Sequence, residues 1–364
     1  MITRVLVIGL SNIGDAVLMS PVVQQLHEQV PDAETTLLVG ERAKAVFDGD
    51  PRIDRLLCFE EFEGWWGRLR LLRVVWALNP DLLIDLRQTA LPLLWKPWRL
   101  LCYYWPVPKA VVHMRDRHLW RLHRQAGRVA GSPTKTPPRS LDESPGHGRG
   151  LLLGMSPEGR GSSRSPGFAR GAPPALWITD EDATYASRLI QHRGLSAAKP
   201  MVILCPGARS HIKRWYADRF AALADRLITD VDAEVVFTGE PGEAPIVTEI
   251  LGAMRHRAHN AVGRLTLRQL AALMQGASLV VTNDSASLHI AASVGAPILA
   301  LFGPTDPRKY GPTGARDRVI RRQLFCSPCE SATCRFQHEC LRFISVDEVY
   351  EMARQMLGGV RVGA

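Results

Sequence analysis

The strongest constraint on the fold is a regular alternation between short apolar runs and longer amphipathic segments, which occurs twice along the chain. The apolar runs of the first half lie at residues 4–10, 33–40, 52–59 and 81–86. An amphipathic helix is expected at residues 65–78. Runs of this length that alternate with helices are typical of buried parallel strands joined by crossover connections. We therefore predict an α/β fold with a doubly wound parallel sheet.

The same alternation restarts in the second half. Its expected strands are residues 200–208, 233–239, 278–284 and 297–304, and its expected helices are residues 180–192, 215–229, 243–254, 265–276 and 285–295. Thr179 is expected to be the N-cap of the first of these helices. Two such blocks predict two Rossmann-like domains that face a cleft, and ligands of such sheets bind beyond the carboxyl ends of the strands.

The composition changes between the two blocks, where Gly, Pro, Ser and Arg dominate. Such a segment cannot bury enough apolar surface to offset the entropy of ordering, so we predict a flexible insertion or linker. The predicted division is an N-terminal domain at 1–130, the insertion at 131–174, a C-terminal domain at 175–345, and a C-terminal helix and tail at 346–364.

Length and composition exclude some classes of protein. The chain has 364 residues, of which 46% are hydrophobic, so it can build two cores. No uncharged apolar run reaches the roughly 18 residues that a spanning helix needs. The first residues lack the cleavage pattern of a signal peptide, and the expected location is therefore the cytoplasm.

The chain is basic, with 45 Lys and Arg against 36 Asp and Glu and a net charge of +9. This charge suits nucleic acid, an anionic membrane surface or a phosphorylated substrate, or it serves only solubility. Residues 92–120 are rich in aromatic and basic side chains. They either touch an anionic membrane surface or form part of the N-terminal core.

The turn "SNIGD" follows the first expected strand and leads into a helix. Gly9 and Gly14 flank this turn, so backbone N–H groups at the helix start can approach an anionic ligand. Asp15 is a carboxylate at the start of an otherwise apolar helix. It is either a first-turn acid that complements the helix dipole or a general base at the cleft.

Two further turns carry charged side chains at strand ends. Arg209, Lys213 and Arg214 follow the strand at 200–208, where they form either a phosphate site or a solvated basic loop. The next strand ends in "FTGEPGE". Its Glu240 or Glu243 either accepts hydrogen bonds from ribose hydroxyls or is a first-turn acid of the following helix.

The turn "NDSAS" is the richest in polar groups. It places Asn283, Asp284, Ser285 and Ser287 where a buried strand becomes a buried helix, with His289 one turn further on. Asp284 or Ser285 is expected to be the N-cap, which explains one of these groups. The others would surround a helix N-terminus that points into the cleft and favours an anion. His289 is either a ligand contact or a hydrogen-bonded helix residue.

Taken together, "GLSNIGDAVLMSPVVQQL", "PGARSHIKRW", "NDSASLHIAASVGAPILALFGPTDP" and "YGP" resemble family 9 glycosyltransferases, which include the ADP-heptose:lipopolysaccharide heptosyltransferases. The resemblance extends from residue 4 to about residue 355, apart from the insertion. It implies a GT-B fold in which the N-terminal domain holds the acceptor and the C-terminal domain holds the nucleotide-sugar. It also implies inverting, metal-independent transfer of heptose to a sugar hydroxyl of the lipopolysaccharide inner core.

The resemblance implies roles for individual residues. Asp15 matches the general base, Lys213 matches a lysine on the donor phosphate, and Glu243 matches an acid that binds the ribose. The donor-binding residues that it implies are Gly14, Arg209, Lys213, Glu243, Asp284, Ser285, Ala286, Ser287 and His289. Ala286 departs from the family, which usually has glycine there. If this position required a positive φ, alanine would cost free energy.

Seven cysteines are an odd number, which argues against a complete disulfide framework. Cys58, Cys102 and Cys205 lie in apolar stretches and are expected in cores. The other four are Cys326, Cys329, Cys334 and Cys340, spaced C-x2-C-x4-C-x5-C. In a reducing compartment this spacing predicts a structural zinc site, or else free thiols in a loop. No cofactor is expected for catalysis.

Other functions stay open. A family member could use a different nucleotide-sugar or acceptor, as in capsule or O-chain synthesis. A non-enzymatic basic module that binds nucleic acid or membrane is an alternative, although it would not require a carboxylate at a cleft. A dinucleotide oxidoreductase is excluded because the G-x-G-x-x-G spacing is absent. The expected partners are therefore a nucleotide-sugar and an anionic glycolipid, with peripheral contact with the inner membrane and no nucleic acid.

Overall fold

The computed structural model describes residues 2–89, 91–92, 106–126, 176–192 and 194–358. Cys102, the predicted insertion at 131–174 and the part of the aromatic segment from 93 to 105 lie outside these residues. None of the helices in the described part of the chain combines the length and the apolar character that crossing a bilayer requires.

The N-terminal half forms a parallel sheet in the order β3-β2-β1-β4. Its strands are β1 Arg4–Ile8, β2 Glu34–Val39, β3 Arg55–Cys58 and β4 Leu82–Asp85. Its helical segments are α1 Ile13–Gln29, α2 Glu41–Phe47, η1 Phe59–Phe62, α3 Gly64–Leu78 and α6 Met114–Ala126. Alternate residues of β1 enter different cores, because Val5 and Val7 face the layer that contains α1 whereas Leu6 and Ile8 face α3.

The C-terminal half forms a second parallel sheet in the order β10-β9-β8-β5-β6-β7. Its strands are β5 Met201–Cys205, β6 Glu234–Phe237, β7 His259–Asn260, β8 Leu279–Asn283, β9 Ile298–Phe302 and β10 Arg318–Arg321. The order reverses between β5 and β8, which makes a switch point of the kind where Rossmann-like sheets bind ligands.

Helices cover both faces of this second sheet. They are α7 Asp180–His192, α8 Ala217–Val231, α9 Ala244–Ala253, α10 Leu267–Gln275, α11 Ala286–Ser293, α12 Pro307–Tyr310, α13 Glu339–Arg342 and α14 Val346–Gly358, with short 3-10 turns at η3 His211–Lys213 and η4 Pro241–Glu243. Thr179 caps α7, since its Oγ1 accepts a hydrogen bond from the Asp182 N–H at 3.1 Å. The predicted α/β class with two doubly wound sheets is therefore confirmed.

Several elements were not predicted, for reasons that lie in their sequences. β7 has only two residues, too few for a periodic signal. α6 reads "MRDRHLWRLHRQA", in which arginine and histidine take many positions that apolar side chains usually occupy. Its burial depends on Leu122 and on polar contacts such as the Gln125 Oε1, which accepts the Asp85 N–H at 3.0 Å.

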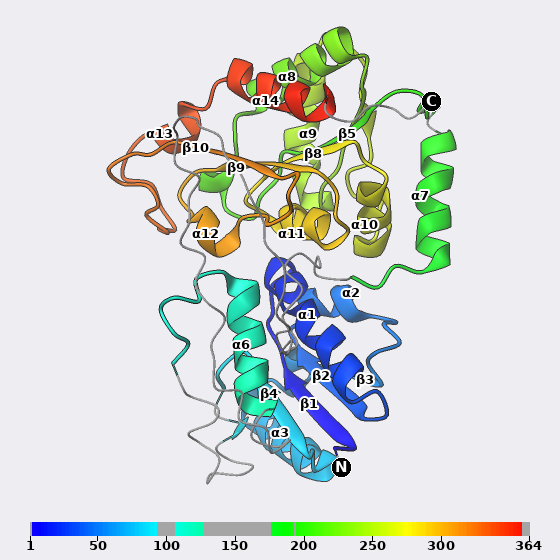
Figure 1. Ribbon diagram of the computed structural model, residues 1–364, viewed down its shortest axis with the longest axis vertical. Coiled ribbons are helices and arrows are strands. Elements are labelled where there is room, and N and C mark those ends of the chain that lie inside the picture. Colours follow the sequence, from blue (N-terminus) through cyan, green and yellow to red (C-terminus); the bar gives the residue numbers. More distant parts are fainter. Residues whose placement is uncertain (1, 90, 93–105, 127–175, 193, 359–364) are drawn as a thin grey trace, which may run out of the picture.

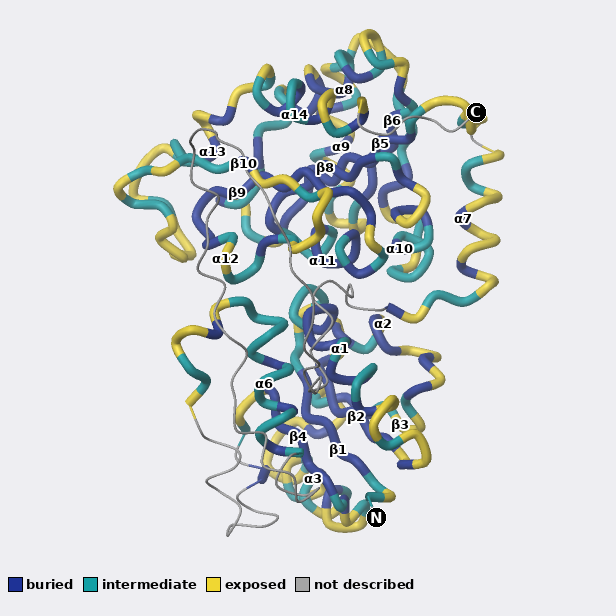
Figure 2. The backbone as a smooth tube through the Cα atoms, viewed as in Figure 1, coloured by how far each residue is buried: buried dark blue, intermediate teal, exposed yellow. Residues whose placement is uncertain are grey.

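The two sheets point the carboxyl ends of their strands toward one another, and α1 packs against α11 across the junction (Figure 1). This contact depends on Gly14. A Cβ atom at Gly14 would lie 2.9 Å from Cδ2 of His289, closer than real side chains approach. Figure 2 shows that the central strands of both sheets and much of α1 are buried.

Candidate functional site

Asp15 lies in the first turn of α1, at the junction between the two sheets. Its Oδ2 accepts a hydrogen bond from Nδ2 of Asn12 at 3.1 Å. The Oδ1 of the same Asn12 accepts a hydrogen bond from Nη1 of Arg209 at 2.7 Å, and Arg209 belongs to the loop after β5. One amide thus connects the partly exposed Asp15 carboxylate to a guanidinium of the opposite half.

Lys213 is held against the start of α11. Its Nζ lies 2.7 Å from Oδ2 of Asp284, and the same oxygen accepts the Thr305 hydroxyl at 2.6 Å. Asp284 is only 6% exposed, whereas the side chain of Lys213 is 30% exposed. The predicted phosphate lysine is therefore positioned by a buried carboxylate while part of it still faces solvent.

Several polar side chains of the turn after β8 make hydrogen bonds that hold the fold together. Ser285 is the N-cap residue of α11, as one of the two expected candidates, but its side chain makes no cap hydrogen bond. Asn283 joins two loops, since its Nδ2 donates to the Pro206 carbonyl at 2.8 Å. Ser287 hydrogen-bonds the buried Cys205 thiol, whose pKa burial raises to about 12.

Ala286 is the first residue of α11, and its φ is not positive. Alanine therefore carries no left-handed backbone strain at this position. The backbone of the turn is an ordinary helix start, with the first N–H groups of α11 directed toward the junction.

His289 is buried beneath the turn of α1. Burial lowers its pKa from 6.5 to about 4, although the nearby Asp284 and Asp15 oppose the shift. The imidazole is therefore neutral at physiological pH. Because Asp284, Asp15 and Lys213 all act on His289, the structure brings these predicted site residues, which lie on both sheets, to one place.

Glu243 lies at the next strand end and packs on two glycines. A Cβ atom at Gly207 would lie 1.9 Å from Cδ of Glu243, and one at Gly239 would lie 2.4 Å from Oε2. Glu243 and Glu240 form a capping box, with the Glu240 N–H donating to Oε2 of Glu243 at 3.0 Å. Burial raises the pKa of Glu243. Glu240 instead pairs with Arg42 of the N-terminal half at 3.0 Å.

Two residues at the junction were missed from the sequence. His113 Nε2 lies 3.0 Å from the Gly311 carbonyl oxygen, and burial lowers the pKa of this imidazole. Tyr310 is near both Glu330 and Asp15, and burial together with these carboxylates raises its pKa. No local signal marks His113, because its partner is 198 residues away. The motif "YGP" does contain Tyr310.

The cysteine-rich segment is anchored beside β9, where Ser327 Oγ donates to the Gly303 carbonyl at 2.8 Å. Burial, and to a smaller extent the thiols of Cys334, Cys326 and Cys329, raises the pKa of Cys340. The four thiols are thus neighbours. Among the described residues, however, no three His, Cys, Asp or Glu side chains are placed to hold a metal ion. The zinc site stays a prediction from the cysteine spacing.

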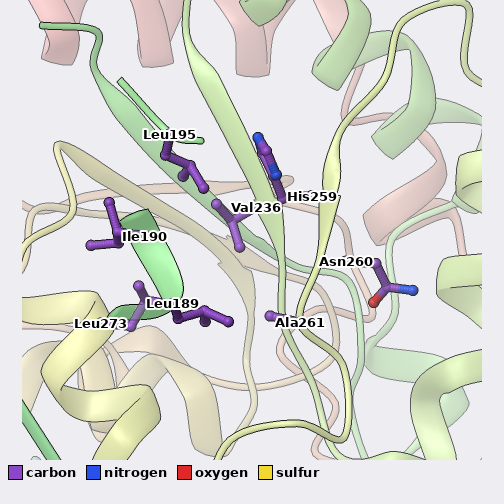
Figure 3. A pocket seen from close by; sticks show the side chains of 8 residues that line it. All are labelled: Leu189, Ile190, Leu195, Val236, His259, Asn260, Ala261 and Leu273. Atoms are coloured by element: carbon purple, nitrogen blue, oxygen red, sulfur yellow. The ribbon is translucent and has the colours of Figure 1, made fainter. Parts of the chain in front are cut away.

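A small cavity of about 10 Å³ lies elsewhere, between α7, α10 and the strands β6 and β7 (Figure 3). Its lining is mostly apolar, with Leu189, Ile190, Val236 and Leu273 pointing inward. This volume holds at most one water molecule. The cavity is therefore a packing defect and not the ligand site.

Comparison with known proteins agrees with the architecture. Residues 172–339 match the family model described as glycosyltransferase family 9 (heptosyltransferase). The lipooligosaccharide heptosyltransferase 2 of Haemophilus influenzae is 35% identical over 153 residues, which cover 40% of this chain and 44% of that protein. The chain thus matches less than half the length of this relative.

Solved structures match nearly the whole chain. A family 9 glycosyl transferase from Veillonella parvula has a TM-score of 0.73 at 22% identity, with 98% of each chain covered. The ADP-heptose lipopolysaccharide heptosyltransferase II of Escherichia coli has a TM-score of 0.71 at 22% identity, with 98% of this chain and 99% of that chain covered. The fold is therefore of the GT-B type.

The packing of Glu243 predicts the effect of Gly207→Ala. The new methyl group would occupy the position of the Glu243 carboxyl group, so that side chain must leave its site. We expect the free energy of unfolding in urea to fall by about 1–3 kcal/mol. Gly252→Ala in α9 is the matched control, because nothing lies within 4 Å of its added Cβ. Equal stability of the two variants would show that Glu243 is not packed in this way.

The depressed pKa of His289 predicts a dependence of stability on pH. In the unfolded chain the imidazole takes up a proton near pH 6.5, but in the folded protein it does so only near pH 4. The unfolded state therefore binds more protons between these values, and stability falls as the pH decreases through this window. Between pH 7.5 and pH 4.5 the free energy of unfolding in urea should fall less in His289→Gln than in the wild type. We expect this difference to be up to about 3 kcal/mol. The exposed His27→Gln should leave the dependence unchanged.

Proposed function

We propose that the chain is a family 9 glycosyltransferase, an inverting, metal-independent transferase that moves heptose from ADP-heptose to a sugar hydroxyl of the lipopolysaccharide inner core. One observation carries this proposal. Asp15, from the first sheet, shares the junction with Lys213, Asp284 and the start of α11, from the second. A proposed base and a positively charged site for an anion thus face the same space from opposite halves.

Asp15 is the proposed general base. Its carboxylate would take the proton of the acceptor hydroxyl while that oxygen forms a bond to the anomeric carbon of the donor. The bond from this carbon to the diphosphate breaks on the opposite face, and ADP leaves with the electron pair. Asn12 would hold the Asp15 carboxylate during this step, because its Nδ2 donates to Oδ2 in the free enzyme.

The developing charge on the diphosphate needs stabilisation, and Lys213 together with the first N–H groups of α11 is proposed to supply it. In the free protein the Lys213 ammonium is paired with Asp284. An arriving diphosphate would share this ammonium and place its own charge near the N-terminus of α11. His289 adds no charge here, since it is neutral.

Glu243 is the proposed ribose contact. The two bare glycines beneath it, Gly207 and Gly239, let its carboxyl group lie at the carboxyl ends of β5 and β6. Nucleotide riboses in Rossmann-like sheets are commonly bound by an acid in such a position. The capping box with Glu240 orients this side chain before a nucleotide binds.

An anionic glycolipid acceptor fits the net charge of +9. Because such an acceptor is anchored in a bilayer, the proposed enzyme would work at the cytoplasmic face of the inner membrane. A family member with a different donor or acceptor is the alternative, and a panel of nucleotide-sugars incubated with truncated lipid acceptors would separate the two by product mass. Turnover with ADP-heptose supports the proposal, and turnover only with another nucleotide-sugar overturns it.

We expect Asp15→Asn to lower the rate of heptose transfer by about 100-fold or more, because the amide cannot take up the proton. Donor binding should be retained, as measured by the thermal shift on addition of ADP. Asp32→Asn changes an exposed acid near the far end of α1 and should leave turnover intact. An unchanged rate in Asp15→Asn would eliminate Asp15 as the base.

Asn12 is expected to act by positioning Asp15. Asn12→Ala loses the hydrogen bonds to Asp15 and Arg209, so kcat should fall about tenfold with little change in the KM for the donor. Asn12→Ser is the matched variant, because serine still caps a helix but cannot bridge Arg209 and Asp15. If Asn12→Ser retains the full kcat, the bridge from Asn12 to Asp15 and Arg209 does not contribute to catalysis.

A further inference from the structure

Helix α3 carries the largest exposed aromatic surface in the described part of the chain. Trp65 is 71% exposed, Trp66 is 80% exposed and Trp76 is 59% exposed. Leu71 and Val75 of this helix are buried against the sheet, and Leu72, Val74 and Leu78 are partly buried against the same cluster. The helix thus belongs to the N-terminal core through one narrow face and leaves its bulkiest apolar side chains in solvent.

The exposed side chains form an ordered stripe. At about 100° per residue, positions 65, 69, 72 and 76 fall within one arc of about 60° along the helix, over a length of about 16 Å. Trp65 and Trp76 mark the two ends, and Leu69 and Leu72 lie between them. Such a stripe is the apolar face of an amphipathic helix, and only its Leu72 packs partly on the core, whereas Trp65 and Trp76 remain in solvent.

Arginines flank this stripe. Arg68 lies on one side and Arg73 on the other, and both are exposed. Arg70 is also exposed, and its guanidinium lies over the Phe62 ring at 5.1 Å. Residues 64–80 contain no acidic side chain at all. The face is therefore apolar along its middle and positive along its edges.

This pattern identifies the chemistry of the partner. Tryptophan is enriched at the boundary between lipid headgroups and acyl chains, where its ring is partly apolar and its N–H stays hydrated. Flanking arginines pair with anionic headgroups, and the helix itself carries no acid, although the exposed Glu61 and Glu63 directly precede it. A protein partner would need acids opposite the arginines and a pocket for each ring, whereas a fluid anionic bilayer accommodates the whole stripe.

We propose that the solvent-facing side of α3, defined by Trp65, Trp66, Leu69, Arg73 and Trp76 with Arg68 at its edge, docks flat on an anionic lipid bilayer. Figure 1 places α3 at the end of the N-terminal sheet that lies away from the second sheet. Docking there keeps the C-terminal half in water. The inference rests on the proposed function only in that a lipid-anchored acceptor would lie on the same surface.

The test measures binding of the full-length protein to vesicles by sedimentation. We expect binding to vesicles of phosphatidylglycerol and phosphatidylethanolamine that weakens as salt is raised, and little binding to phosphatidylcholine alone. The Trp65→Ser/Trp66→Ser/Trp76→Ser variant should bind at least about tenfold more weakly. Arg68→Gln and Arg73→Gln should each weaken binding to the anionic vesicles about fivefold.

The matched control is Phe325→Ser/Phe336→Ser, which removes two exposed aromatic side chains from the C-terminal half and should bind vesicles like the wild type. Urea unfolding of every variant checks that its fold is intact. Wild-type vesicle binding by the triple tryptophan variant would overturn the proposal. The proposal would also be overturned if, in the absence of lipid, the wild type were a dimer and this variant a monomer. The stripe would then pair two copies of the chain.

The docking proposal and the proposed function can be tested separately. The triple tryptophan variant should still show the thermal shift with ADP and should still glycosylate a water-soluble, deacylated acceptor. Asp15→Asn should bind vesicles normally. A variant that keeps transfer to the soluble acceptor and loses only vesicle binding supports α3 as the docking surface.

Discussion

The close approach of α1 to α11 is the constraint on which the candidate site depends. Both helices start at the carboxyl end of a central strand, so their N-termini point into the same junction. They meet because Gly14 has no side chain where His289 packs. This contact brings Asp15 of one sheet within electrostatic reach of Asp284 and Lys213 of the other. Without it, each half would carry only part of a site.

The electrostatics of the junction are arranged before any ligand binds. Asp284 is buried and held by Lys213 and Thr305, so the cation is aimed at the start of α11. His289 is kept neutral by burial and contributes shape rather than charge. The polar side chains after β8 therefore divide into two groups. Asn283 and Ser287 connect loops and strands, whereas Asp284 sets the position of the Lys213 ammonium.

Two surfaces of the N-terminal half face different surroundings. The carboxyl ends of its strands face the second sheet, and the outer face of α3 presents Trp65, Trp66 and Trp76 to solvent. The spacing of apolar residues at 65–78 correctly predicts an amphipathic helix. Periodicity cannot say which apolar side chains reach the core, because Gly67 and Leu71 rather than the tryptophans meet η1 and the sheet.

The sequence by itself determined the class of fold and the strand ends at which Asp15, Lys213, Glu243 and Asp284 stand, because strand and helix periodicity and turn composition are local properties. Only the tertiary structure decided how these turns pair. Lys213 meets Asp284 across 71 residues, and Asn12 meets Arg209 across 197 residues. Such pairs depend on strand order and on the docking of two sheets, and no pattern within a single turn encodes either one.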